Sequence, residues 1–129
     1  MSVQQVRLTG AEWQVMECLW AGAPMSGREV TQTLEPKTGW SRSTILTLLS
    51  RLEAKGAVAG DSQGGKKRFL PLLRREDAAL QETETFLEKV YHGSLSLMVS
   101  ALTQRQALSP EEIHQLHQLL DGLEGGNRP

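Results

Sequence analysis

The sequence of 129 residues has a single cysteine, Cys18, so no disulfide can form within the chain. An unpaired thiol gives no reason to expect an oxidising compartment. Long apolar runs are missing as well, because no stretch approaches the ~18 residues that would suggest a membrane span. The N-terminus "MSVQQVRLTG" lacks the apolar region of a secretory signal. We therefore expect a cytoplasmic protein that does not enter a membrane.

Signatures of enzymes are also absent from the sequence. It contains no P-loop, no G-x-S-x-G and no H-E-x-x-H. Cys18 lies among the apolar residues of a predicted helix, where a buried, inert thiol is the more common role. His114 and His117 are three residues apart and could share a metal ion, but no third ligand accompanies them. We predict no enzyme activity, no cofactor and no metal site.

The length of the chain suits one modest hydrophobic core, or one small domain with an extension. The net charge of -1 conceals an asymmetry between its two parts. Residues 1–73 have nine Lys/Arg and six Asp/Glu, for +3, whereas residues 74–129 have five and nine, for -4. A basic part joined to an acidic part suggests that the first part meets a polyanion. Chance segregation of surface charge explains this number equally well.

Four helix starts share one pattern: an apolar residue, a Ser or Thr N-cap, and a second apolar residue five positions after the first. At the caps Thr9, Ser26 and Ser109, a glutamate three residues later completes a capping box. At Ser41, Thr44 takes the place of that glutamate. The pattern predicts helices near residues 10–21, 27–35, 42–55 and 110–123. The segment "PKTG" predicts a break after the second helix.

The segment "AVAGDSQGGKKRFLPLL" after the third helix predicts two short strands around a Gly-Gly turn. Pro71 is expected at an edge or a strand end, because proline cannot donate to a ladder. The earlier segment "AGAPM" has room for a bend or a single strand pairing. Three short amphipathic helices follow the hairpin, and they could pack as their own bundle or against a second subunit. The tail "EGGNRP" is expected to be frayed.

Three helices followed by a β-hairpin is the order of the winged helix-turn-helix, in which the third helix enters the DNA major groove. We therefore predict a mainly α fold with a small β-hairpin. Its winged-helix domain spans residues 1–73, and helices fill residues 74–129.

The predicted third helix, residues 41–55, has an unusual exposed side. Its apolar stripe is opposite short hydroxyl residues, not the Glu and Lys that favour a solvated helix. Short hydroxyl side chains allow close approach to base edges, and arginine can pair with guanine or a phosphate. Leu46 is expected to be exposed, where it could meet a thymine methyl group. The DNA contacts predicted on this helix are Ser41, Arg42, Ser43, Thr44, Leu46, Thr47 and Arg51.

Basic residues elsewhere in the first part suit phosphate contacts. Arg28 stands at the start of the second helix, and Lys66, Lys67 and Arg68 stand at the tip and returning strand of the hairpin. The plainer interpretation is that these are ordinary solvated charges. We favour DNA binding because the helix order, the hairpin and the hydroxyl face agree.

The segments "LTGAEWQVMECLW", "GWSRSTILTLLSRLEAKGAV", "FLPLLRREDA" and "FLEKVYHGSL" resemble the penicillinase-repressor family of BlaI, MecI and CopY type, over about residues 7–123. The resemblance implies a homodimeric winged-helix repressor that binds a palindromic operator in double-stranded DNA. Residues 74–129 would then form a helical dimerisation domain with a frayed tail. The candidate residues of its interface or core are Leu80, Phe86, Leu87, Leu95, Met98, Val99, Leu102, Leu116 and Leu120.

The family releases DNA in two known ways. In the β-lactam branch a membrane sensor triggers cleavage of an Asn-Phe bond, for which this chain has Ala101-Leu102. A sensor protease is thus a partner implied by the resemblance, but its cleavage bond is not matched. The copper branch uses C-terminal cysteines, which this chain lacks, so direct Cu(I) sensing is not expected. Leu46 stands where relatives often have a basic residue, and we expect it to change which DNA is read.

Two alternatives to an operator-binding repressor of this kind stay open. The first is a winged-helix regulator of another type that a small-molecule ligand releases. The second is a winged-helix protein-interaction module that does not bind DNA. The hydroxyl face and the basic hairpin weigh against the second, and nothing in the sequence excludes the first.

Overall fold

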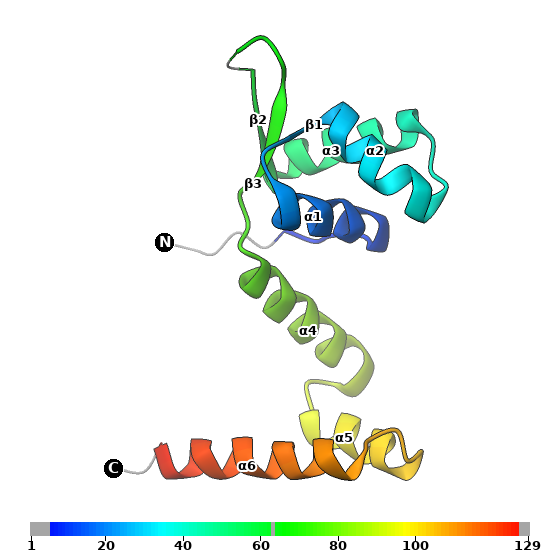
Figure 1. The fold of residues 1–129 in the computed structure, drawn as a ribbon. Coiled ribbons are helices and arrows are strands. Elements are labelled where there is room, and N and C mark those ends of the chain that lie inside the picture. The colour runs from blue at the N-terminus through cyan, green and yellow to red at the C-terminus, as the bar shows by residue number, and fades with distance from the viewer. Residues whose placement is uncertain (1–5, 63, 127–129) are drawn as a thin grey trace. The chain divides into compact units, whose positions relative to one another are not determined.

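The computed structural model describes residues 6–62 and 64–126 (Figure 1). It is mainly helical, with one small antiparallel sheet. The chain divides into two compact units, Met1–Thr83 and Glu84–Pro129. Its elements are α1 (Gly10–Gly22), β1 (Met25–Ser26), α2 (Gly27–Thr38), α3 (Arg42–Lys55), β2 (Val58–Asp61), β3 (Arg68–Pro71), α4 (Arg75–Tyr91), α5 (Leu95–Gln104) and α6 (Pro110–Gly126).

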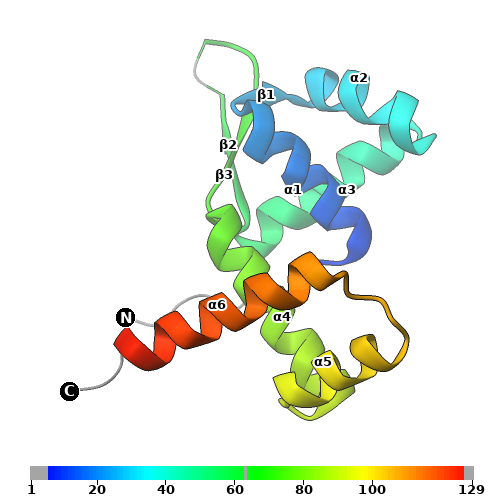
Figure 2. The same cartoon turned by 60° about the horizontal axis from the view of Figure 1, so that its bottom comes forward.

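The first unit is a three-helix core closed by the sheet. Figures 1 and 2 show α1, α2 and α3 grouped together, with β2 and β3 running side by side. Each helix supplies one apolar stripe to a shared core, and the sheet adds Val58 and Phe69. The apolar helical side chains with 1% exposure or less are Val15, Met16, Leu19, Val30, Ile45, Leu49 and Leu52. The predicted winged helix is confirmed.

The sheet has three strands in the order β1-β3-β2, all antiparallel. The hairpin of β2 and β3 was predicted, and Pro71 lies at the end of β3 opposite Val58, where a missing donor costs least. Met25 of β1 pairs with Phe69 of β3, which is the single strand pairing for which "AGAPM" has room. This pairing attaches the hairpin to the segment between α1 and α2.

The predicted capping boxes are present in the structure. At Thr9 and Ser26 the cap side chain accepts from the backbone of the third helical residue, whose glutamate accepts from the cap in return. Ser109 and Glu112 make the same reciprocal bonds at α6. At α3 the Ser41 hydroxyl alone accepts, from the Thr44 backbone N–H. Satisfying these N–H groups defines where each helix begins.

The predicted end of the second helix is wrong by about one turn. α2 continues through Pro36 to Thr38. Pro36 lies in the last turn, where a missing N–H removes only one helical bond. The Thr38 hydroxyl donates to the Leu34 carbonyl, and Gly39 then closes the helix. Gly39 has a φ of 74°, which favours glycine, so the break in "PKTG" begins at its last residue.

The remaining helices leave many apolar side chains exposed. α4 begins in the first unit, ends in the second, and is followed by Gly93 with a φ of 82°. In the described part of the chain, α5 has no fully buried side chain. α6 runs to Gly126, so the expected fraying of "EGGNRP" concerns residues 127–129, which lie outside the described residues. Within residues 6–62 and 64–126, no helix is both long and apolar enough to cross a membrane.

Candidate nucleic-acid interface

The two sides of α3 differ as the sequence predicts. Its apolar stripe of Ile45, Leu48, Leu49 and Leu52 is buried in the core. The opposite side is exposed, and it carries Arg42, Ser43, Thr44, Thr47, Ser50 and Arg51. Because burial of the stripe fixes the rotation of α3, this polar side is the one that α3 presents to solvent.

Three hydroxyl groups gather at the start of α3. The Ser41 oxygen lies 3.1 Å from the Ser43 oxygen and 3.1 Å from the Thr44 oxygen. All three side chains are exposed. A hydroxyl group can donate or accept, so this cluster can exchange its internal bonds for bonds to base edges or phosphates.

The prediction that Leu46 is exposed is wrong. Leu46 is half-buried and packs against the core. It lies over the start of α2, where a Cβ added to Gly27 would come 2.8 Å from its Cδ2 atom. The helical periodicity of α3 could not show this contact, because it depends on how closely α2 approaches.

The predicted basic residues outside α3 lie near one another. Arg28 is exposed in the first turn of α2, and Arg68 pairs with Ser26 across β1 and β3. The backbone hydrogen bond from Ser26 lowers the pKa of Glu29, and the positive charges of Arg68 and Lys66 lower it further. The start of α2 and the basic side of the hairpin therefore form one electropositive region beside the cap of α2.

Lys67 differs from its basic neighbours, because it already has a partner. Its Nζ lies 2.9 Å from Oε1 of Glu53, in the last turn of α3. The same Nζ lies 5.3 Å from the centre of the Phe69 ring. Sequence reasoning missed this pair, since its two residues are 14 positions apart and belong to different elements.

A second ion pair holds the end of α3 against α1. Lys55 Nζ donates to Glu12 Oε1 at 2.5 Å and to the Arg7 carbonyl at 2.7 Å. Glu12 is only 1% exposed. Burial alone raises the pKa of Glu12, but hydrogen bonds from Lys55 and Thr9 and the charge of Lys55 outweigh it, so the pKa is lowered. The capping box signalled Glu12, but only the fold identifies Lys55 as its partner.

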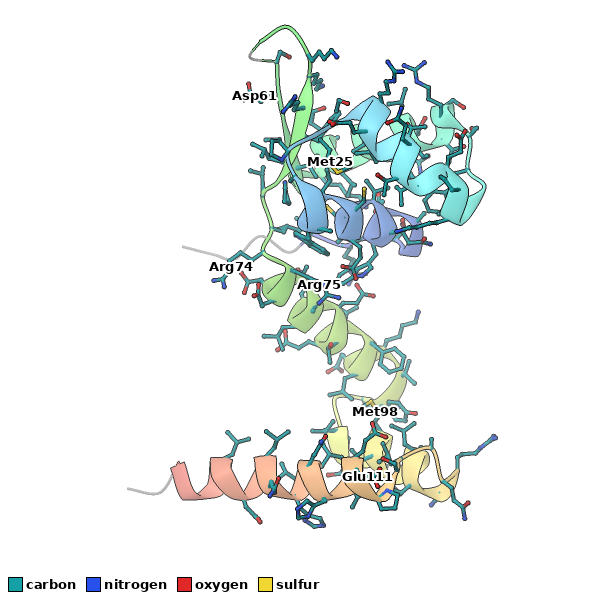
Figure 3. The ribbon with its side chains drawn as sticks, in the orientation of Figure 1. Met25, Asp61, Arg74, Arg75, Met98 and Glu111 are labelled. Atoms are coloured by element: carbon teal, nitrogen blue, oxygen red, sulfur yellow. The ribbon has the colours of Figure 1, made fainter. Side chains whose placement is uncertain are left out.

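A cluster around Arg75 anchors the first turn of α4 to α1 (Figure 3). Arg75 donates two hydrogen bonds of 2.9 Å to Glu17, and these bonds lower the pKa of that carboxyl group. Its Cζ atom lies 5.9 Å from the centre of the Trp13 ring and 6.0 Å from that of the Trp20 ring. Trp20 Nε1 donates to the Leu73 carbonyl at 2.9 Å. The chain leaving β3 is thus tied to α1 at successive points.

The remaining chemically notable side chains show no catalytic arrangement. Cys18 is 9% exposed, its sulfur lies 3.7 Å from the Met25 sulfur, and burial raises the pKa of its thiol. The predicted burial of this thiol is confirmed. His114 and His117 are exposed on α6. In the described ranges, no three His, Cys, Asp or Glu side chains lie close enough together to hold a metal ion.

The three-helix core, the three-stranded sheet and the basic hairpin beside an exposed polar helix define a winged helix-turn-helix protein. The model of the penicillinase repressor family matches residues 8–122, which is most of the chain. The chain belongs to this family, whose members are transcriptional repressors and not enzymes.

Two relatives match this chain over nearly their whole length. The penicillinase repressor of Bacillus licheniformis is 32% identical over 115 residues, covering 89% of this chain and 90% of that protein. The methicillin resistance regulatory protein MecI of Staphylococcus aureus strain N315 is 26% identical over 121 residues, covering 94% and 98%.

Two solved structures resemble more than half of the chain. The solution structure of the DNA-binding domain of the repressor BlaI superimposes with a TM-score of 0.52 and 30% identity, covering 60% of this chain and 93% of that one. The monomeric form of Bacillus licheniformis BlaI, solved in complex with the blaP half-operator, gives a TM-score of 0.51 and 31% identity. That match covers 55% of this chain and 87% of the other.

Proposed function

We propose that this protein is a homodimeric transcriptional repressor that inserts α3 into the major groove of a palindromic operator. The proposal rests mainly on one observation: α3 exposes a side of hydroxyl and arginine residues, while its opposite, apolar side is buried in the core. A related repressor at 31% identity was solved with a half-operator, which supports the same use of this fold here.

The contacts divide into base reading and backbone binding. Ser43, Thr44, Thr47 and Arg51 lie where α3 would face base edges or adjacent phosphates. Leu46 would reach DNA only with the part of its side chain that α2 leaves uncovered. The residues proposed to bind the phosphate backbone are Arg28, Ser41, Arg42, Lys66 and Arg68. Lys67 was predicted among them, but its pairing with Glu53 gives it the different role argued below.

Dimerisation is proposed for the helices of residues 74–129. Leu80, Phe86, Leu95 and Leu120 are each 48–60% exposed. The other predicted interface residues, Leu87, Met98, Val99, Leu102 and Leu116, are half-buried. Apolar side chains exposed in such number favour burial against a second copy. The division into compact units falls at Thr83, within α4, so this helix would join the DNA-binding unit to the dimer.

Selection of bound sequences from a random DNA pool tests the proposal directly. We expect a palindrome whose half-sites lie about one helical turn apart, roughly 34–36 Å, or a multiple of it. Arg51→Ala should abolish selection, while Gln32→Ala on the exposed side of α2 serves as the matched control. Binding to no duplex would refute DNA binding. A footprint without twofold symmetry, or a monomer by light scattering, would refute the dimer.

We also propose a sensor protease as the partner that releases the repressor from DNA. The Ala101-Leu102 bond lies inside α5, where the carbonyls of both residues accept backbone hydrogen bonds from Arg105 and Ala107. Cleavage there would therefore require α5 to open locally. Mass spectrometry of the protein recovered from β-lactam-treated cells tests this: a fragment ending at Ala101 supports it, and an intact chain on derepression contradicts it.

A further inference from the structure

We infer that Glu53 and Lys67 act as a positioning pair that fixes the wing, residues 58–62 and 64–71, against α3, and that Lys67 is not a phosphate contact. The inference rests on the proposed DNA binding and concerns how its two contact regions are held together. Lys67 directly precedes β3, while Glu53 lies in the last turn of α3. Their ion pair of 2.9 Å therefore joins the wing to the helix proposed to read DNA.

The position of Lys67 is defined by two neighbours. Its ammonium group binds the Glu53 carboxylate and lies 5.3 Å from the centre of the Phe69 ring. Phe69 is 7% exposed and belongs to the core, so the ring is a fixed surface. A cation over an aromatic face gains electrostatic energy in addition to its ion pair. The side chain of Lys67 is thereby directed toward α3.

Gly60 provides the room in which the pair sits. It lies opposite Phe69 in the register of β2 and β3. A Cβ added to Gly60 would clash with Cε of Lys67 and would lie 2.8 Å from Oε2 of Glu53. Both charged side chains thus cross the strand where it lacks a side chain. Glycine at this position is explained by the pair, since its φ is not in the left-handed region.

The pair also removes an electrostatic conflict. Glu53 is the one acidic residue in the sequence from Arg42 to Lys55. An unpaired carboxylate on a helix that approaches DNA would repel phosphates. Lys67 neutralises this carboxylate, so its own positive charge is balanced within the protein and is not left to bind a phosphate. Lys66, its exposed neighbour at the tip, is proposed to meet the phosphate instead.

A double-mutant cycle on operator binding tests the pair, with Lys66→Met as the matched control. We expect Lys67→Met and Glu53→Met each to weaken binding about two- to fivefold, as for an exposed ion pair, and the double variant to lose no more than either one. The salt dependence separates the roles. Lys66→Met should reduce the slope of log K against log salt by about 0.9, whereas Lys67→Met should leave it nearly unchanged.

The opposite pattern would overturn the inference. If Lys67 binds phosphate, Lys67→Met lowers the slope as Lys66→Met does, and Glu53→Met strengthens binding by removing a repulsive charge. A readout on the free protein keeps this test separate from the proposed function. Lys67→Met should lower the {1H}-15N NOE of the wing amides, and Lys66→Met should not. Failure of the unmodified protein to bind any duplex would refute DNA binding, while unchanged wing NOEs would refute the pair.

Discussion

Replacing Lys55 by methionine should destabilise the DNA-binding unit far more than an ordinary surface change. Methionine keeps an unbranched apolar side chain of nearly the same length but removes the ammonium group from Glu12, which is 1% exposed. Glu12 would keep the backbone N–H of Thr9 as a hydrogen-bond donor, with no charge to balance its own. The variant therefore forces a choice between burying an unpaired carboxylate and protonating it.

The expected loss in the free energy of unfolding follows from how exposed Glu12 and Lys55 are. Breaking a fully buried pair costs about 3–5 kcal/mol, and breaking an exposed pair costs up to about 1 kcal/mol. Because the Lys55 side chain is 35% exposed, solvent screens part of the interaction, and we expect a loss of about 2 kcal/mol. For a domain of this size, that loss lowers Tm by about 8–16 °C.

Urea and thermal unfolding at fixed protomer concentration measure this loss. Lys37→Met, at an exposed lysine in the last turn of α2, is the control and should stay within about 0.5 kcal/mol of the unmodified protein. Glu12→Gln combined with Lys55→Met should recover much of the loss, because the amide is neutral and still accepts from Thr9.

The pH dependence of stability gives a second check, because it tests whether the pKa of Glu12 is lowered by Lys55. The lowered pKa of Glu12 stabilises the native state above about 4.5, the ordinary value, and this stabilisation is lost as pH falls through the folded pKa. Without Lys55, burial should raise the pKa of Glu12. The difference between the two proteins should therefore be largest near neutral pH and shrink in acid. A loss below about 0.5 kcal/mol at pH 7, or one that does not change with pH, would refute this reasoning.

Three further changes test contacts described above. Arg75→Met should raise the pKa of Glu17 toward its ordinary value, and a carboxyl 13C titration showing no change would contradict the cluster on α4. Gly27→Ala should displace Leu46 and cost about 1–2 kcal/mol in urea unfolding, a loss that Leu46→Ala in the same chain should reduce; additive losses would contradict the contact. Leu46→Arg should change the sequences selected from a random DNA pool, and an unchanged consensus would show that this side chain does not reach the bases.

Features that depend on neighbouring residues could be predicted from the sequence. The capping boxes at Thr9, Ser26 and Ser109 lie within four residues of chain, so they located the helix starts closely. The apolar stripe of α3 fixed which of its sides is exposed, because a helix has a constant periodicity.

Features that depend on the packing of distant elements could not be predicted in this way. Leu46 is half-buried because α2 starts at a glycine that lets it approach. The pairs of Glu12 with Lys55 and Glu53 with Lys67 join residues 43 and 14 positions apart. Charges that looked alike in the sequence thus differ in the fold: both hairpin lysines are exposed, but Lys67 is paired with Glu53.

Because Cys18 is largely buried, the rate at which its thiol is alkylated can be used to follow openings of the first unit. The thiolate is the form that alkylating reagents attack, and burial both raises the pKa of this thiol and covers it with α1 and its neighbours. Since the sequence has no other cysteine, alkylation of the unmodified protein reports only on the accessibility of Cys18, which any opening of the core around it increases. The rate of labelling, followed with and without DNA, therefore measures how strongly a bound duplex suppresses that opening, with no engineered probe and no signal from α5 or α6.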